Sequence, residues 1–226
     1  MATMTINRNP VFSAITASAH HALIAGASGS GKSTFLENII YDILTHNPAE
    51  CQMVLIDPKR VELSRFKHTA HCAGYATEPE DIEALLNKCL ALVDYRYREM
   101  EQAGARKYTG TKLYIIVDEL ADIAFTSKRA FELLERLARI ARAAGVQLIC
   151  ATQNINAEVI PTRLKCNLDT RVSVPVSSVS ESRVILGIAG AETLSIGEAI
   201  IKTGCKVERV TFPEVDTEPL IAFWKR

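Results

Sequence analysis

A glycine-rich run near the start of the chain has the composition and spacing of a phosphate-binding site. Residues 26–33 read GASGSGKS and match the spacing GxxxxGK[ST]. In such a loop the glycines let backbone N–H groups curl around a phosphate, the lysine ammonium reaches the β- and γ-phosphates, and the final hydroxyl reaches Mg²⁺. The residues predicted to bind ATP are Gly26, Ala27, Ser28, Gly29, Ser30, Gly31, Lys32, Ser33 and Thr34, with Ser33 also a Mg²⁺ ligand.

The surroundings of this run favour the same interpretation. An apolar stretch at residues 22–26 predicts a buried strand before the loop, and apolar residues at helical spacing over 32–46 predict a helix after it. The N-terminus of that helix also favours anions, because its first N–H groups are unpaired and its dipole is positive there. A chance glycine-serine turn is the alternative, and it gives no reason for this order of elements.

An acidic pair follows a second apolar run and suits the same chemistry. Residues 113–117 predict a buried strand that ends in Asp118 and Glu119. A carboxylate at the end of a strand beside the phosphate loop is placed to hold the Mg²⁺ shell, which is the role predicted for Asp118. Glu119 is placed to orient and deprotonate an attacking water, which favours a hydrolase over a kinase.

Two further features are typical of motor ATPases. An additional apolar strand is predicted at 52–56, between the phosphate-loop unit and the strand that ends in Asp118. Thr152 and Gln153 follow a fourth apolar run, 146–151, and Gln153 is placed to sense the γ-phosphate. The Thr-Gln pair carries meaning only together with the other motifs.

Arg142 differs from the two arginines before it. Arg136 and Arg139 each have a glutamate four residues earlier and can form intrahelical pairs, whereas Arg142 has Ala138 at that position. One interpretation is a solvated arginine that is compatible with the dipole of its helix. The other is an arginine finger that reaches the ATP of a neighbouring subunit.

The order of the predicted elements defines the fold class as α/β. Strands alternate with helices of about 15 residues, which predicts a mainly parallel central sheet with helices on both faces. Pro175 suggests that the fifth strand lies at an edge or ends there. The expected strands are 22–26, 52–56, 113–117, 146–151 and 171–176, the expected helices are 32–46, 82–100 and 128–144, and a C-terminal hairpin is expected from 198–203 and 206–212.

Composition bounds the class of protein. Twenty-six basic residues balance 26 acidic ones, and 48% of the residues are hydrophobic, which excludes a disordered or strongly charged chain. The excess of basic residues lies in 128–171 and that of acidic residues in 78–101. No run of 18 apolar residues predicts a membrane segment, no apolar N-terminal segment predicts secretion, and the six cysteines form no CxxC pair, so a cytoplasmic protein is expected.

Several longer blocks carry a resemblance to a known family. In order, they are GASGSGKS (26–33), DPKRVEL (57–63), YRYREMEQAGARKY (95–108), IIVDELAD (115–122), RLARIARAAGVQLICATQ (136–153), KCNLDTRVSVPVSS (165–178) and GAETL (190–194). From His21 to about residue 203, the chain resembles the motor domain of the FtsK/SpoIIIE DNA translocases. That resemblance implies a RecA-like P-loop NTPase that forms a hexameric ring around double-stranded DNA and moves along it using ATP and Mg²⁺.

The resemblance also implies roles for particular residues. Lys32 and Ser33 correspond to the phosphate and Mg²⁺ ligands, and Asp118 and Glu119 to the metal-shell acid and the catalytic base. Gln153 corresponds to the sensor and Arg142 to the finger that acts in trans, so the resemblance favours the second interpretation of that arginine.

Two loops correspond to the DNA-facing loops of the family. They are Asn154–Lys165 and Val179–Arg183, in which Lys165 and Arg183 keep the cationic character and are the predicted DNA contacts. Asn154 and Val179 stand where the family usually has arginine and lysine. Each lost phosphate contact removes nearly one unit from the salt dependence of binding.

One domain is expected, with residues 1–20 as an N-terminal segment, 21–203 as the family-like core and 204–226 as the second hairpin strand and a tail. Neither end is long enough for a membrane anchor or an orientation-reading module, so the chain resembles a stripped motor core of the kind found on phages and other mobile elements. The tail, which holds Trp224, either packs on the motor itself or docks another protein. Two alternative functions stay open: a DNA-pumping ATPase docked to a packaging or conjugation machine, and a non-hydrolysing, nucleotide-gated assembly protein.

Overall fold

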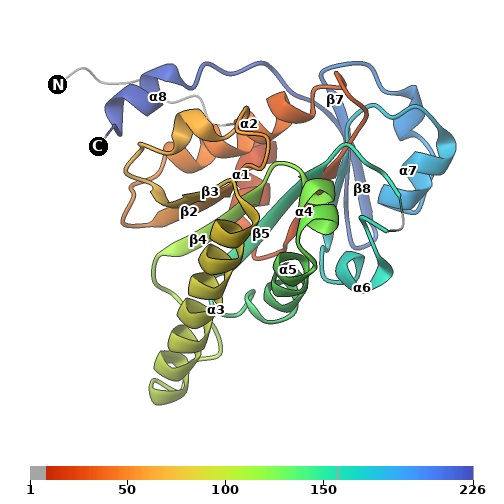
Figure 1. Cartoon of the computed structure of the whole chain (residues 1–226). Helices are drawn as coiled ribbons and strands as arrows, with labels where there is room; N and C mark the ends of the chain where they lie inside the picture. The colour runs from red at the N-terminus through yellow and green to blue at the C-terminus, as the bar shows by residue number, and fades with distance from the viewer. Residues whose placement is uncertain (1–8, 157, 226) are drawn as a thin grey trace.

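A single eight-stranded sheet organises the protein. The computed structural model describes residues 9–156 and 158–225. The strands lie in the order β3-β2-β4-β5-β1-β6-β7-β8, of which the first six are parallel, while β7 pairs antiparallel with both β6 and β8 (Figure 1). The strands are β1 (Ala22–Ala25), β2 (Cys51–Ile56), β3 (Cys72–Ala76), β4 (Lys112–Val117), β5 (Val146–Thr152), β6 (Thr170–Ser173), β7 (Glu198–Thr203) and β8 (Lys206–Thr211).

Helices cover both faces of the sheet, as the sequence predicts. The helices are α1 (Pro10–Ala17), α2 (Lys32–Leu44), α3 (Pro79–Gln102), α4 (Leu120–Thr126), α5 (Lys128–Ile140), α6 (Thr162–Lys165), α7 (Val179–Leu186) and α8 (Glu218–Phe223). Successive residues of a strand point to opposite faces, so neighbours in β1 and β4 enter different cores. Leu23 and Ile115 pack with α3, α4 and α5, whereas Ile24 and Ile116 pack with α1 and α2. The α/β class and the mainly parallel sheet are therefore confirmed.

Several elements carry too little sequence signal to be predicted: the short helices α4, α6, α7 and α8, and also β3 and α1. β3 reads CAGYA, and only its first and last residues are buried, so neither an apolar run nor a strict alternation marks it. It pairs with β2 and forms one edge of the sheet. α1 lies in the predicted N-terminal segment, where Pro10 opens it and the Asn9 side chain accepts a hydrogen bond from Val11 N at 3.0 Å. Residues 1–8 of that segment lie outside the described residues.

Three predicted features need correction. α5 ends at Ile140 rather than at 144, and residues 141–145 form a turn that closes at Gly145, with φ +69°. Of the two alternatives for Pro175, the strand end is correct, because β6 ends at Ser173, and the edge position is wrong, because β6 lies between β1 and β7. The strand that separates β1 from β4 in the sheet is β5, whereas β2 lies on the other side of β4.

The C-terminal part contains the predicted hairpin and a tail that packs on the protein's own surface. β7 and β8 pair through a turn in which Gly204 has φ +60°. In the tail, Leu220 is buried, and Trp224 Nε1 donates to Leu44 O at 2.8 Å. The packing interpretation of the tail is therefore correct for these residues, whereas Phe223 is exposed.

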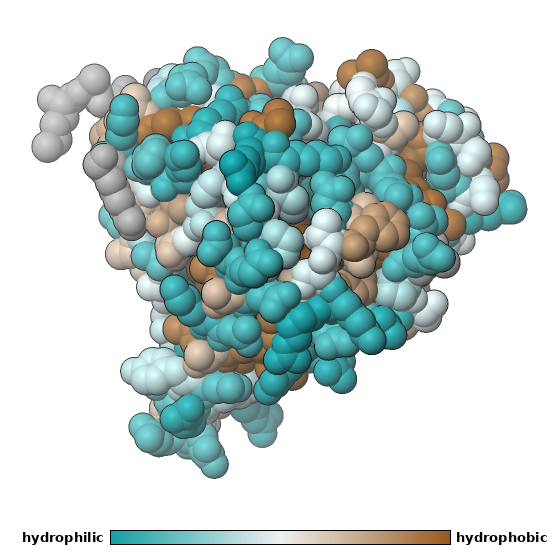
Figure 2. All heavy atoms as spheres, viewed as in Figure 1, coloured by the Kyte–Doolittle hydropathy of each residue, from teal (hydrophilic) through white to brown (hydrophobic). Residues whose placement is uncertain are grey.

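The surface is mixed in character. Figure 2 shows a largely hydrophilic face with apolar residues in small groups. Among the described residues, no helix combines the length and the apolar composition needed to cross a membrane.

Candidate active site

The predicted phosphate loop lies at the carboxyl edge of the sheet, between β1 and α2. Its conformation depends on glycine at two positions. Gly31 caps α2 with φ +90°, a left-handed value that other residues rarely adopt. A Cβ atom at Gly26 would lie 2.1 Å from Val174 Cγ2, so only glycine fits against the residue that follows β6. The loop is fixed at its start by a hydrogen bond of 3.0 Å from Ala27 N to Pro175 O.

Lys32 and Asp118 form a buried ion pair next to this loop. The Lys32 ammonium lies 3.0 Å from Asp118 Oδ1 and donates to Asp118 O at 3.2 Å. Both residues are 3% exposed. Burial raises the pKa of the Asp118 carboxyl, and the neighbouring ammonium opposes that shift. The two predicted ligands of phosphate and Mg²⁺ therefore meet as expected, although Lys32 opens α2 and Asp118 follows β4.

Glu119 is held by the end of the neighbouring strand. Its carboxylate accepts hydrogen bonds from Thr152 Oγ1 at 2.6 Å and from Gln153 N at 3.2 Å. The same carboxylate accepts from Ala121 N at 3.4 Å and so caps the start of α4. Glu119 is 2% exposed. The structure thus joins the predicted base to the predicted sensor segment, and it does so through the backbone N–H of Gln153 rather than through its side chain.

The loop after β2 brings two charged residues to the site that the sequence analysis did not assign. Glu62 accepts a hydrogen bond from Ser33 Oγ at 2.7 Å, and Lys59 lies 3.5 Å from a Glu119 oxygen. Asp57 holds this loop in place, because its carboxylate accepts from the backbone N–H of Leu63 at 3.0 Å. The block DPKRVEL marked the loop in the sequence, but no local rule assigns these contacts to it.

The side chains fit a magnesium-bound nucleoside triphosphate. Ser33 supplies a hydroxyl, while Asp118 and Glu62 supply carboxylates, and oxygen donors of this kind suit Mg²⁺. Among the described residues, the backbone N–H groups of Ser28, Gly29 and Gly31 make no hydrogen bond within the chain. These free donors lie at the N-terminus of α2, where an anion is favoured.

Arg142 lies at the opposite edge of the sheet. It belongs to the turn before β5, whereas Thr152 and Gln153 mark the end of that strand. β5 has seven residues, so the two edges are separated by roughly 20 Å at about 3.3 Å per residue. The structure therefore does not bring Arg142 to the other predicted site residues of the same chain.

The arginines of α5 and of the turn after it have other partners than the sequence suggests. Arg142 has an acidic partner outside its helix, because its guanidinium lies 3.0 Å from Asp169 Oδ2, next to β6, and 3.3 Å from His20 Nε2. The intrahelical pairs expected for Arg136 and Arg139 are absent from the described residues. Their proposed partners contact other arginines: Glu132 lies 4.0 Å from Arg129, and Glu135 pairs with Arg163.

The two predicted DNA contacts lie in adjoining segments but differ in exposure. Arg183 is exposed on α7, whereas Lys165 is half-buried at the end of α6 and donates to Val184 O at 3.0 Å. Lys165 therefore joins the end of the first predicted DNA-facing loop to the residue that follows the second. Ala157, within the first of these loops, lies outside the described residues.

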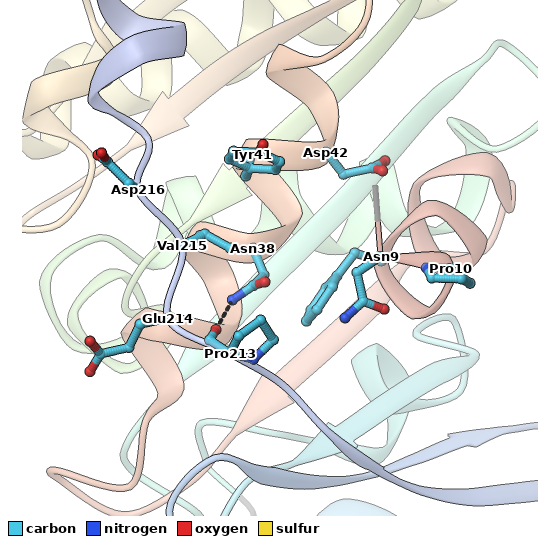
Figure 3. Close-up of a pocket in the computed structure, with 10 residues that line it drawn as sticks. Asn9, Pro10, Asn38, Tyr41, Asp42, Pro213, Glu214, Val215 and Asp216 are labelled. Carbon is cyan, nitrogen blue, oxygen red and sulfur yellow. Dashed lines mark hydrogen bonds between the residues drawn. The ribbon is translucent and has the colours of Figure 1, made fainter. Parts of the chain in front are cut away.

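A groove of about 550 Å³ lies beside α2 rather than over the phosphate loop. Figure 3 shows Asn38 reaching across it to the segment after β8, where its amide donates to Pro213 O at 2.8 Å. The Asp42 carboxylate at its wall is already bonded to the hydroxyls of Ser13 and Thr16. The polar groups of this groove therefore connect α1, α2 and the tail.

The fold and the site together are those of a P-loop ATPase. Among solved structures, the conjugation coupling protein TcpA of pCW3, in a monomer form with ATPγS, matches with a TM-score of 0.80 and 22% identity over 89% of this chain and 62% of that chain. At that identity the likeness concerns the fold.

Sequence comparison identifies the family. The model of the FtsK/SpoIIIE family matches residues 2–115, half of the chain, and the protein belongs to this family. DNA translocase FtsK of Oceanobacillus iheyensis is 38% identical over 196 residues, and DNA translocase SpoIIIE of Bacillus subtilis is 37% identical over the same length. Each alignment covers 77% of this chain and 25% of the relative, so the chain spans about a quarter of the length of these relatives.

Proposed function

We propose that this chain is an ATP-hydrolysing motor domain that moves double-stranded DNA as a homohexameric ring. Family membership supports the class of activity. The observation that carries the proposal is that the buried pair of Lys32 and Asp118 and the buried Glu119, which is bonded to Thr152, lie at the same edge of the sheet. A protein that binds nucleotide without hydrolysing it has no need of a carboxylate placed to activate water.

In the proposed mechanism, the free N–H groups of the loop and the Lys32 ammonium bind the phosphates of ATP. Ser33 and Asp118 would hold Mg²⁺, which when bound would neutralise the charge that develops on the phosphoryl oxygens. Glu119 orients the attacking water and accepts its proton. In the described state Glu119 is bonded to Thr152 and Gln153, so it must turn toward the water for this step.

The same hydrogen bonds offer a link between hydrolysis and DNA. Gln153 immediately precedes the first predicted DNA-facing loop, and its backbone N–H is bonded to the base of the hydrolysis reaction. A movement of Glu119 toward water therefore releases the start of that loop. In a ring, repeated release of this kind would move the bound duplex.

Arg142 acts in this proposal on the ATP of a neighbouring subunit. Its distance from the phosphate loop of its own chain supports this assignment, since β5 is longer than an arginine side chain. An arginine supplied in trans stabilises the charge of the transition state and is worth about 10³–10⁵ in rate in phosphate-loop proteins that use one. Asp169 and His20 hold the guanidinium before it engages that site.

The test of the function is ATP turnover by the full chain with and without long duplex DNA at low salt. Turnover should rise with duplex DNA. In the presence of an ATP analogue, the protein should assemble with the stoichiometry of a ring. The Lys32→Ala variant should bind ATP weakly and serves as the inactive control. Turnover that ignores duplex DNA would contradict the proposal.

A further inference from the structure

The turn at residues 141–145, which carries Arg142, is fixed by another part of the chain. Each backbone carbonyl from position 140 to position 145 accepts a hydrogen bond. The carbonyls at 141, 142 and 145 accept from N–H groups of the turn itself, of β5 or of β4. Those at 140, 143 and 144 accept from residues between 96 and 108, at the end of α3 and after it.

Arg96 makes the central contacts. Its guanidinium donates to Ala144 O at 2.8 Å and to Thr111 O at 2.7 Å, and the residue is 5% exposed. The guanidinium carbon lies 4.2 Å from the centre of the Tyr108 ring. The backbone N–H of Tyr108 donates to Ala143 O at 2.9 Å. One buried side chain thus joins α3, the segment before β4 and the turn that bears Arg142.

Two neighbouring contacts complete this arrangement. Tyr97 Oη donates to Ile140 O at 2.5 Å, at the last residue of α5. Gly145 closes the turn against Tyr108, since a Cβ atom there would lie 3.0 Å from Tyr108 Cδ1. We call Arg96, Tyr97 and Tyr108 the arginine clamp. All three belong to the block YRYREMEQAGARKY, to which neither the site nor the proposed function has assigned a role.

We propose that the arginine clamp positions Arg142 for the ATP of a neighbouring subunit. This inference rests on the proposed function, in which Arg142 acts in trans. Catalytic groups tolerate little displacement, and a misplacement of about 1 Å can cost roughly 10²-fold in rate. A planar guanidinium suits the central position because its fixed fork of donors reaches two separate carbonyl groups, whereas a lysine ammonium is a single point of contact.

The first experiment is the Arg96→Lys substitution in the full chain, assayed for DNA-dependent ATP hydrolysis. The clamp predicts that kcat falls about 10- to 100-fold while the dissociation constant for ATP stays within about twofold. Arg98→Lys is the matched control, because Arg98 lies two positions away on the exposed face of α3. An Arg96→Lys protein with native kcat would overturn the inference.

A mixing experiment separates positioning in trans from damage to the variant's own site. Arg96→Lys subunits are co-assembled with Glu119→Gln subunits, which lack the base but keep a native Arg142 and a native clamp. The sites of the Arg96→Lys subunits then receive an undamaged arginine, so activity should recover several-fold over either protein alone. Arg142→Ala subunits mixed in the same way provide the reference.

The Arg142→Ala mixture distinguishes a failure of the clamp from a failure of the proposed trans placement of Arg142. If Arg142→Ala recovers on mixing and Arg96→Lys does not, Arg96 supports its own active site and the clamp is wrong. If Arg142→Ala itself fails to recover, the trans placement in the proposed function is wrong.

Tyr97→Phe removes one hydroxyl from a surface residue and tests the clamp if Arg96→Lys does not fold. It should lower kcat by about two- to fivefold, and an unchanged kcat would also overturn the inference.

Discussion

The two edges of the sheet hold their charged residues in opposite ways. At the carboxyl edge Lys32, Asp118 and Glu119 are 3%, 3% and 2% exposed and bond to one another or to the next strand. At the amino edge the Arg142 side chain is 50% exposed, although the turn that bears it is fixed by the buried Arg96 guanidinium at Ala144 O. The first edge is a site that a single chain assembles. At the second edge, the exposed Arg142 side chain projects from a turn whose backbone is fixed.

The largest expected effect concerns the outward-facing edge. Arg142→Ala should lower ATP turnover by about 10³-fold or more, because the transition state loses a cation supplied across the subunit contact. ATP binding should change little, since Arg142 lies far from the phosphate loop of its own chain. The measurement is steady-state hydrolysis together with nucleotide titration. Arg139→Ala, an exposed neighbour on α5, is the control, and native turnover in Arg142→Ala would remove the proposed role.

The next effect belongs to the assembled edge. Glu119→Gln should lower kcat by about 10²- to 10⁴-fold, the range expected for loss of a general base, and leave ATP bound but unhydrolysed. Asp122→Asn is the matched control, because Asp122 is a nearby carboxylate that contacts the same Lys59 ammonium, at 3.7 Å. Single-turnover assays with excess protein separate the chemical step from product release. Equal losses in the two variants would mean that Glu119 acts through local charge alone.

A smaller effect concerns the pH dependence of stability and comes from His21, at the amino edge of the sheet. Burial, aided by the Arg142 charge, lowers the pKa of His21 from 6.5 to about 4. His21 Nδ1 accepts a hydrogen bond from Leu148 N at 2.9 Å, so the folded protein requires the neutral ring. Below pH 6.5 the unfolded chain takes up a proton that the folded chain refuses, and stability therefore falls as the pH drops toward 4.

This titration predicts a loss of about 3 kcal/mol in the free energy of unfolding between pH 6.5 and pH 4. Urea unfolding of the native protein and of His21→Asn at several pH values isolates the contribution, since other groups titrate equally in both. The variant should show a flatter dependence over that range. Parallel pH profiles for the two proteins would exclude His21 as the source.

The smallest effect concerns DNA. Arg183→Ala should reduce the slope of log binding constant against log salt concentration by about 0.9, the value for one phosphate contact. Arg129→Ala, another exposed arginine, should leave the slope unchanged. Lys165→Ala should change the slope less than Arg183→Ala, because the Lys165 ammonium is bonded to Val184 O. A native slope in Arg183→Ala would remove this residue from the DNA contacts.

The contrast between the edges also explains what the sequence could predict. The carboxyl edge is built from local signals, since glycine spacing fixes the loop and apolar runs end in Asp118 and in Thr152. Contacts between segments distant in the chain carry no such signal. Glu62 meets Ser33 across 29 residues and Arg96 meets Ala144 across 48, and neither pair follows from periodicity. The block around each residue was visible in the sequence, but its role required the structure.

The same reason accounts for the errors around Arg142. Helical spacing offers Arg136 and Arg139 an acid four positions earlier and offers Arg142 none, yet Glu135 meets Arg163, and Asp169 meets Arg142. These partners come from α6 and from the residue before β6, so tertiary packing overrides the local rule. β3 was not predicted because three of its five residues are partly exposed, and such an edge strand needs no continuous apolar run.

The most direct test of the two-edge account is the mixture of Arg142→Ala and Glu119→Gln proteins. The Arg142→Ala protein alone lacks the arginine at every active site, and the Glu119→Gln protein alone lacks the base. A mixed ring contains some sites with a native base and a native arginine from the next subunit. DNA-dependent hydrolysis should therefore appear on mixing, with a maximum near equal proportions. A mixture as inactive as its two components, under conditions where both assemble, would contradict the account.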